Sequence, residues 1–419
     1  MGIALFEDAN WQNFSPISHT KAAFDIKIGA KSYFEEHSEI PEVLLTREYL
    51  AGVTAERHAE CNVNPSSIDS DTVFVNGLLH PGVIDPHLLS KGSHTFAITV
   101  GGRLIAARLS KKTIEYLSER VTSGKKIDVR KIGAEKVKEL RTEEAQGLLS
   151  NSWDIITVLE NSLAMQVAKI QGESDLGQGV RVAGNHNVAI AKNASVEEGT
   201  VLDARKGGIY IGPDAYIATS RIVGPAFIGA MTQVKQFSII ESSHIGYNCR
   251  VAGEIEHSII SDHTNKAHAG FVGHSYIGEW VNLGAMTTTS DLKMTYGNIK
   301  IGSGKKKIDT GHNKIGSFLG DMAKSSIGTI IYSGRRIGVS SHLHGLVAQD
   351  VPDFTIYGAT IGAKNAELEL KSAIETQRKM MSRRNQVMSK AYEQVIKDLF
   401  SMTANARKHS GVRKVKFTL

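Results

Sequence analysis

The sequence predicts three parts: a mixed α/β domain over residues 1–175, a parallel β-helix over residues 176–363, and a C-terminal helical cap with a basic tail over residues 364–419. Three observations support this division. Short apolar runs alternate with helical patterns in the first part. Aliphatic–glycine pairs recur at a nearly fixed interval in the second. Apolar residues at helical spacing then run from Ala366 to Met402.

The first part opens with the strand-like run Ile3–Phe6. Further runs of this kind lie at 72–75 and 96–100. The pair Gly101-Gly102 after the last run predicts a hairpin that returns along residues 102–108. Helical spacing predicts helices at 111–120, 143–150 and 153–169. These elements together favour a layered α/β sheet.

This first part lacks a glycine-rich loop after its first strand. Glu7 and Asp8 follow the strand directly, and no glycine lies between Gly2 and Gly29. Glycines at this place normally let backbone N–H groups approach phosphates. A nucleotidyl transfer that uses Mg²⁺ and a nucleoside triphosphate would have to rely on other early residues. The candidates are Asp8, Lys21, Asp25 and Lys27.

The rhythm of the second part is set by Ile211-Gly212, Ile228-Gly229 and Ile245-Gly246. The pairs are about three hexads apart, which is typical of a parallel β-helix. We expect the aliphatic residue to point into the core and the glycine to fit the corner. Roughly nine or ten coils of about 18 residues fit this part, and each coil needs the next to satisfy its strand edges.

Residues 286–314 break the rhythm, which predicts a loop that leaves the wall. The later helical pattern is expected to cap the open end of the coil stack, where strand edges would otherwise stay unpaired. The tail at 408–416 is basic.

Composition narrows the possible functions. The 419 residues contain 40 glycines but only 8 prolines, which excludes a collagen-like or low-complexity chain. A net charge of +6 does not imply nucleic acid, because a basic cleft for phosphate-bearing small molecules explains it equally well. Cys61 and Cys249 form no metal or redox motif. We expect a cytoplasmic protein without a signal peptide or membrane span.

The candidate catalytic residue is His268, because Ala267, Ala269 and Gly270 leave space around its ring. An imidazole titrates near neutral pH and can remove the proton of an attacking amine. Asn282 follows fourteen residues later, within one coil, and its amide could bind sugar hydroxyls. The alternative is that His268 is an ordinary polar surface residue, like the other 15 histidines.

A metal site is a second alternative for this stretch. His263 and His268 are five residues apart, and His257 and His274 flank them. His244 fits neither one coil nor two before His268. We therefore predict no metal.

The stretch from Lys266-Ala267 through His268 and Phe271 to Asn282 resembles the acetyltransferase site of the bifunctional N-acetylglucosamine-1-phosphate uridyltransferase family. The resemblance implies a left-handed β-helix of hexapeptide repeats after a degenerate nucleotidyltransferase-like domain. It also implies that His268 is the general base, that Lys266, Phe271 and Asn282 bind the amino sugar, and that acetyl-CoA binds between the subunits of a homotrimer.

Three positions depart from the family pattern. Asp291-Leu292 replaces an Asn-Tyr pair of the substrate loop, Phe271 replaces a tyrosine, and Glu256 replaces a lysine. The chain more closely resembles an uncharacterised branch of sugar nucleotidyltransferases. That resemblance rests on residues 15–20, on Trp153-Asp154 and on the segment 375–384, and so covers nearly the whole chain.

The phosphates of CoA require basic residues on the coil surface. The candidates are Lys305, Lys306, Lys307, Arg335 and Arg336, although a basic run is often only a solvated face. Three functions remain open. The first is acetyl transfer from acetyl-CoA to an amino group on a sugar phosphate or nucleotide sugar, the second is nucleotidyl transfer by the first domain, and the third is a non-catalytic assembly or sensing role.

Overall fold

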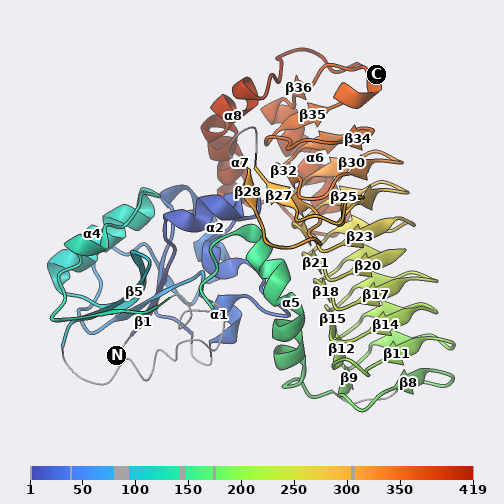
Figure 1. Ribbon diagram of the computed structural model, residues 1–419, viewed down its shortest axis with the longest axis horizontal. Helices are drawn as coiled ribbons and strands as arrows, with labels where there is room; N and C mark the ends of the chain where they lie inside the picture. The colour runs from blue at the N-terminus through green and yellow to red at the C-terminus, as the bar shows by residue number, and fades with distance from the viewer. Residues whose placement is uncertain are drawn as a thin grey trace. The chain divides into compact units, whose positions relative to one another are not determined.

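The computed structural model describes residues 2–37, 40–79, 94–141, 147–172, 176–302 and 307–418 (Figure 1). The chain forms two units. One comprises Met1–Asp154 and Ser389–Asp398, and the other comprises Ile155–Met388 and Leu399–Leu419. Each unit has its own apolar core. None of the described helices is long and apolar enough to cross a membrane.

The first unit is built on a seven-stranded sheet with the order β3-β2-β1-β4-β6-β5-β7. Its strands are β1 (Ile3–Phe6), β2 (Val43–Leu45), β3 (Asn62–Val63), β4 (Val73–Asn76), β5 (Phe96–Val100), β6 (Arg103–Arg108) and β7 (Lys136–Glu139). β1 pairs in parallel with β2 and β4, whereas β6 runs antiparallel to β4 and β5. Gly101 and Gly102 both have positive φ, as a tight hairpin requires. The predicted strands and the hairpin are confirmed.

The helices that accompany this sheet are α1 (Tyr33–Glu36), α2 (Ala51–Arg57) and α4 (Lys111–Thr122), with the short 3-10 helices η1 (Ala9–Phe14), η2 (Ile17–His19), η3 (Ala23–Asp25), η4 (Glu48–Leu50) and η5 (Val129–Lys131). The predicted helix at 111–120 is confirmed as α4. The expected helix at 143–150 is not found in its described part, residues 147–150. Leu148 and Leu149 instead pair as extended chain with Leu79 and Leu78.

The second unit contains a left-handed parallel β-helix with three walls. Wall one contains β8 (Arg181–Ala183), β11 (Val201–Asp203), β14 (Arg221–Val223), β17 (Ile239–Glu241), β20 (Glu254–Glu256) and β23 (Phe271–Gly273), continued by β26 (Thr288–Thr289), β31 (Ile330–Ile331) and β34 (Leu346–Val347). Wall two contains β9 (Val188–Ile190), β12 (Ile209–Ile211), β15 (Ala226–Ile228), β18 (His244–Ile245), β21 (Ile259–Ile260), β24 (Tyr276–Ile277), β29 (Phe318–Leu319) and β32 (Arg336–Ile337). Wall three contains β10 (Ser195–Val196), β13 (Tyr216–Ile217), β16 (Gln233–Val234), β19 (Arg250–Val251), β22 (Asn265–Lys266), β25 (Asn282–Leu283), β30 (Lys324–Ser325), β33 (His342–Leu343) and β35 (Thr355–Tyr357).

The aliphatic residues of the three pairs that set the repeat fill the inside of the coil stack, as predicted. Ile211, Ile228 and Ile245 are fully buried and belong to one continuous core. The glycine that follows lies where successive coils approach closely. A Cβ on Gly229 would stand 2.5 Å from the backbone of Gly246 on the next coil. A side chain at this corner would therefore force the coils apart.

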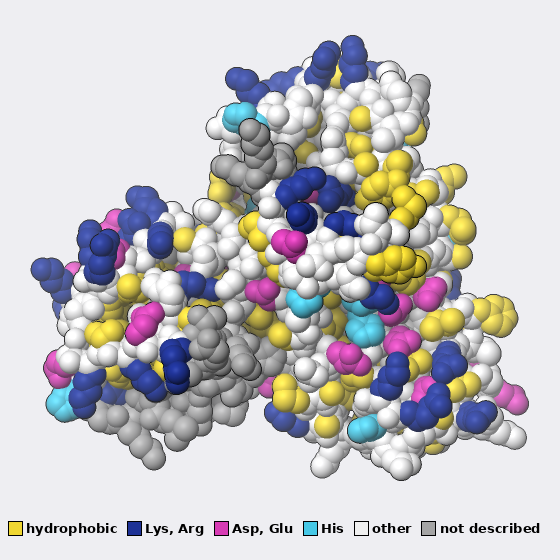
Figure 2. Space-filling model, in the orientation of Figure 1, with side chains coloured by type: hydrophobic (Ala, Val, Ile, Leu, Met, Phe, Trp, Pro, Cys, Tyr) yellow, Lys and Arg dark blue, Asp and Glu magenta, His cyan; other side chains and the backbone are white. Residues whose placement is uncertain are grey.

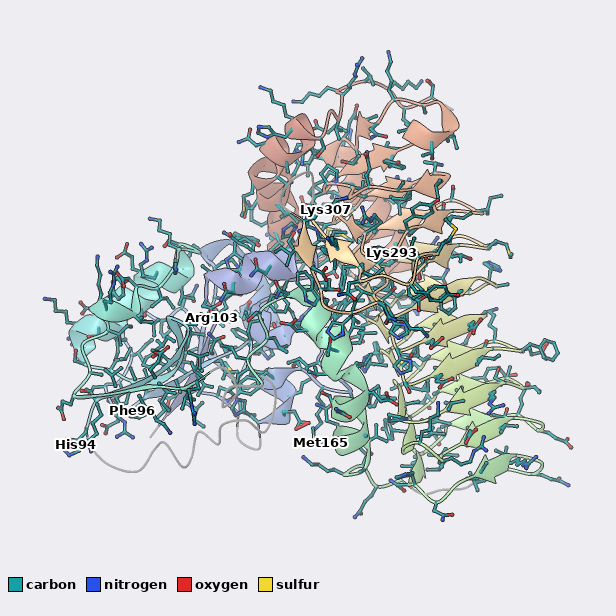
Figure 3. All side chains as sticks on the ribbon, viewed as in Figure 1. His94, Phe96, Arg103, Met165, Lys293 and Lys307 are labelled. Atoms are coloured by element: carbon teal, nitrogen blue, oxygen red, sulfur yellow. The ribbon has the colours of Figure 1, made fainter. Side chains whose placement is uncertain are left out.

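The predicted interruption of the coils is confirmed. Hydrogen bonds between successive coils typically join residues 17 apart, but those across the interruption join residues 42 apart. The extra residues include an antiparallel pair of short strands, β27 (Lys300–Ile301) and β28 (Ile308–Asp309). Figure 3 labels Lys293 and Lys307 on this excursion.

The C-terminal segment differs from the single long helix that was expected. It contains β36 (Ala366–Glu367), α6 (Leu370–Ser382), α7 (Lys390–Met402) and α8 (Ala404–His409). Asn385, with a φ of 56°, lies in the break between α6 and α7. β36 adds an antiparallel strand to β35 and so covers the edge of the last coil. The buried Arg407 pairs with Glu367 at 2.7 Å.

Candidate functional site

His268 lies at the corner where β22 of wall three leads into β23 of wall one. The residue is exposed, and no described residue forms a hydrogen bond with its ring. The chain turns here through Ala267, Ala269 and Gly270, and Gly270 has a φ of 132° that other residues rarely adopt. The corner therefore presents an imidazole with both ring nitrogens open to a ligand.

Lys266 fastens this corner from the inside. Its buried ammonium donates hydrogen bonds to the carbonyl oxygens of Ala252 at 2.6 Å, Gly270 at 2.8 Å and His268 at 3.1 Å. Burial lowers the pKa of Lys266 to about 8. Because all three N–H donors are used, none remains for a ligand. This geometry suits Lys266 to holding the His268 corner in place, and the expected contact of Lys266 with substrate stays a prediction.

Asn282 lies on the outer face of wall three, one coil beyond Asn265. The side-chain amide nitrogen of Asn265 donates to Oδ1 of Asn282 at 2.8 Å. The two residues are register partners in β22 and β25. No described residue accepts a hydrogen bond from Nδ2 of Asn282. Its two N–H groups are therefore available to a hydroxyl or phosphate oxygen.

A cavity of about 520 Å³ lies beside Asn282, between wall three and helix α6. Ala267, the neighbour of His268, also lines it. The strand residues of its floor form one outward-facing column of register partners. That column is Gln233, Arg250, Asn265, Asn282 and Lys324. We call this space the wall-three cavity. The sequence pattern gives no prediction of this cavity.

Phe271 and Asp291 lie on the other side of the His268 corner, on wall one. A Cβ on Gly273 would meet the Phe271 ring and Oδ2 of Asp291, so both side chains lie over this glycine. Burial opposes ionisation of Asp291, but the hydrogen bond from His274 and the charges of His274 and Lys314 outweigh it and lower the pKa of Asp291. The predicted residues thus separate into Asn282 on wall three and Phe271 with Asp291 on wall one, and His268 lies at the corner that joins these walls.

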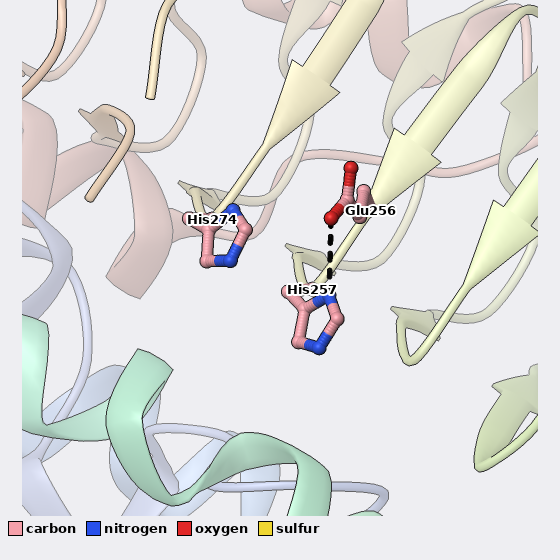
Figure 4. Close-up of side chains that lie close together, drawn as sticks. All are labelled: Glu256, His257 and His274. Carbon is pink, nitrogen blue, oxygen red and sulfur yellow. Dashed lines mark ion pairs between the residues drawn. The ribbon is translucent and has the colours of Figure 1, made fainter. Parts of the chain in front are cut away.

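Glu256, His257 and His274 come close together at the opposite edge of wall one (Figure 4). Each has an ion-pair partner: Lys314 at 3.5 Å from Glu256, Glu160 of α5 (Ser152–Val167) at 3.3 Å from His257, and Asp291 at 2.7 Å from His274. The two imidazole planes are parallel, with centroids 4.9 Å apart. One donor atom from each of the three residues lies within 4.8 Å of the others, and Nδ1 of His257 is buried without a hydrogen-bond partner among the described residues.

Of the basic residues expected to hold CoA, Arg335 and Arg336 are engaged by other groups, whereas Lys307 is exposed. Arg336 forms a two-pronged pair with Asp350, at 2.8 and 2.9 Å. Arg335 donates to the carbonyl oxygens of Ser333 and Ala348. Lys305 and Lys306 lie outside the described residues. Lys and Arg side chains gather over β27 and β28 on the face shown in Figure 2.

The acidic residues that follow β1 belong to internal networks of the first unit. Glu7 is buried and accepts hydrogen bonds from Arg47 at 2.8 Å, from Thr46 and from the backbone N–H of Ala23. Asp8 accepts from Asn76 and from Arg103, which Figure 3 labels, both at 2.9 Å.

The other early candidates are also engaged. Asp25 pairs with His58 at 2.7 Å, and Lys27 pairs with Glu35. Lys21 is buried, and its carbonyl oxygen accepts a hydrogen bond from Arg47. The candidate carboxylates Asp8 and Asp25 are therefore both paired with basic residues of the first unit.

Residues 3–174 match the family model described as sugar nucleotidyl transferase. The chain is 27% identical over 209 residues to a bifunctional sugar-1-phosphate nucleotidylyltransferase/acetyltransferase of Sulfurisphaera tokodaii, covering 48% of this chain and 46% of that protein. This similarity covers about half of the chain. It is also 26% identical over 208 residues to the bifunctional protein GlmU of Methanocaldococcus jannaschii, covering 49% and 45%. The matches span about half the length of these bifunctional relatives.

Proposed function

We propose that this protein is a cytoplasmic homotrimeric transferase of sugar-nucleotide metabolism that moves an acetyl group from acetyl-CoA to an amino group on a sugar phosphate or nucleotide sugar. His268 acts as the general base. The observation that carries the proposal is the exposed, unpartnered imidazole at a corner flanked by the Asn282 wall and the Phe271 wall. The names of the bifunctional relatives support the same chemistry.

The proposed step begins when the substrate amine attacks the thioester carbonyl carbon. His268 removes the amine proton as the N–C bond forms, which prevents a cationic nitrogen from building up. The C–S bond then breaks, and the proton on His268 passes to the departing CoA thiolate. Backbone N–H groups of the coil wall would stabilise the oxyanion between these events.

Asn282 and Phe271 would hold the acceptor sugar from the two sides of the corner. The free N–H groups of Asn282 suit a hydroxyl or phosphate oxygen, and the Phe271 ring suits the apolar face of a sugar. Asp291 stands beside Phe271 as an anion. We propose that it contacts a sugar hydroxyl or the amine.

Nucleotidyl transfer by the first unit is the second candidate, because the family model covers residues 3–174. The engagement of Glu7 with Arg47 and of Asp8 with Arg103 weighs against it at the end of β1. If the first unit does transfer nucleotides, Mg²⁺ and a nucleoside triphosphate would be required. A third candidate is a non-catalytic assembly or sensing role.

One pair of assays separates the three candidates. The purified protein is incubated with acetyl-CoA and a panel of amino-sugar phosphates, and free thiol is measured. Thiol release that His268→Ala abolishes, and that His186→Ala at another exposed histidine leaves intact, supports acetyl transfer. Pyrophosphate release from a nucleoside triphosphate and a sugar phosphate supports the second candidate. If neither thiol nor pyrophosphate is released, the result contradicts the proposal and favours the non-catalytic role.

A further inference from the structure

Six basic side chains surround the wall-three cavity, and no acidic side chain lines it among the described residues. Three come from wall three or its flank, and three come from helix α6 or the residues after it. They are Lys235, Arg250, Lys324, Lys379, Arg383 and Arg384. Bringing six like charges around one space costs free energy unless an anion compensates them.

None of these six cations pairs with a described carboxylate. Arg250 donates only to neutral oxygens, those of Met231, Asn248 and Cys249. Lys324 is half-buried and donates to the carbonyl oxygen of Met322 at 2.8 Å. Burial lowers its pKa to about 8. Nε of Arg384 is buried and has no hydrogen-bond partner among the described residues.

Neighbouring positive charges add to the effect of burial on the pKa values of the two half-buried arginines. Burial, and then the charge of Arg384, lower the pKa of Arg250. Burial and the neighbouring Arg383 lower the pKa of Arg384, opposing the effect of Cys249. Two other arginines of the same unit have carboxylate partners, Arg407 with Glu367 and Arg336 with Asp350. A set of six cations without carboxylate partners around one cavity is typical of a binding site.

The volume of the cavity and its remaining hydrogen-bond donors indicate the class of ligand that fits it. About 520 Å³ is within the usual range for a nucleotide-sized molecule. A single phosphate of about −2 charge would leave most of the six positive charges uncompensated. Two linked phosphates match the cluster better. Asn282 and the indole N–H of Trp280, which has no described acceptor, add neutral donors for the rest of the ligand.

We propose that the wall-three cavity binds the diphosphate group of a nucleotide ligand, with Arg250, Lys379 and Arg383 on the phosphate oxygens. CoA and a nucleotide sugar both carry this group, and the cavity begins at Ala267, next to His268. The identification of the ligand as a substrate rests on the proposed acetyl transfer, but the binding itself does not.

Calorimetry on the full chain tests the proposal with three probes: CoA, UDP-N-acetylglucosamine and inorganic pyrophosphate. We expect CoA or the nucleotide sugar to bind more tightly than pyrophosphate, and the affinity to fall as salt rises. The double variant Lys379→Gln/Arg383→Gln should weaken binding about 10-fold or more, because it removes two charge-assisted contacts. Both residues are exposed, so their loss leaves the fold intact. Lys371→Gln on the same helix, at a side chain 87% exposed, should change the affinity less than about 2-fold.

His268→Ala separates this inference from the proposed reaction, since the variant should bind the nucleotide like the wild type even if acetyl transfer is lost. The proposal is overturned if no probe binds, if the double variant binds as tightly as the wild type, or if Lys371→Gln weakens binding equally. Binding of pyrophosphate as tight as that of both nucleotides would overturn the nucleotide part.

Discussion

Asn265 and Asn282 occupy the same register position on successive coils, and the amide of Asn265 donates to Oδ1 of Asn282 at 2.8 Å. This bond fixes which end of the Asn282 amide is free. The oxygen is taken, so the nitrogen is the group that Asn282 presents to the wall-three cavity. Side chains at the same register position stack on successive coils, and one of them can therefore orient the next.

Asn282→Asp tests that orientation. The variant keeps an oxygen to accept from Asn265 but loses both N–H donors and adds a negative charge. We expect the KM for the amino-sugar acceptor to rise about 10-fold or more, because a lost hydrogen bond to a bound polar group costs about 1.5 kcal/mol. Steady-state kinetics provide the measurement. Asn185→Asp, at an exposed asparagine of the same unit outside the wall-three cavity, is the matched control and should change this KM less than about 2-fold. Equal effects of the two substitutions would remove Asn282 from the acceptor site.

Lys266→Met should lower the free energy of unfolding by roughly 2–4 kcal/mol, because three carbonyl oxygens at the His268 corner lose their donor. Denaturant unfolding measures the change. Lys364→Met is the matched control at an exposed lysine of the same unit and should be nearly neutral. A Lys266→Met protein as stable as the wild type would show that the corner does not depend on this ammonium.

His342 should make the second unit less stable in mild acid. Burial, and then the charges of Lys324 and His344, lower the pKa of His342 to about 4. Between this value and the pKa of about 6.5 in the unfolded chain, only the unfolded state takes up the proton. Stability therefore rises with pH across that window and falls on acidification.

His342→Gln removes this titration. The loss of stability between pH 7 and pH 4.5 should be smaller in the variant than in the wild type by about 1–3 kcal/mol. Denaturant unfolding at the two pH values gives the difference. Parallel pH dependence in both proteins would contradict the assigned shift.

Gly229→Ala should destabilise the β-helix by about 1–3 kcal/mol, because the new Cβ would stand 2.5 Å from the backbone of Gly246. Gly297→Ala in the same unit is the control, since its Cβ would meet nothing nearer than 3.8 Å. That change should be neutral or slightly stabilising, because alanine restricts the unfolded chain. Thermal unfolding of both variants measures the difference in stability. A Gly229→Ala protein as stable as the control would disprove the close approach of Gly229 to the backbone of Gly246.

The coil repeat could be predicted from sequence because it depends on local chemistry. An aliphatic residue such as Ile228 must point inward and a glycine such as Gly229 must follow, whatever the remaining chain does. Local chemistry could not show that the helix expected at 143–150 would be absent from its described part. Leu148 and Leu149 have helical spacing, but a distant partner strand takes their backbone hydrogen bonds.

The site was predicted less completely than the fold. His268 was expected on the surface and is exposed. The inward direction of the Lys266 side chain and the wall-three cavity could not be predicted from the sequence. Lys266 has a polar side chain at a strand end, and only the corner geometry shows that its ammonium points at three carbonyls. The cavity joins Arg250 with Arg383, which are far apart in sequence. The recurrence of polar residues at one coil position was the signal that could have revealed it.

The most direct test of the acetyl-transfer account is a single-turnover experiment with acetyl-CoA bound in advance, in which the N-acetylated sugar is measured by mass spectrometry. The wild-type protein should form product, and His268→Ala should form it about 10²–10⁴-fold more slowly, the usual contribution of a general base, with CoA affinity changed by less than about 2-fold. Equal rates in the two proteins would contradict the account.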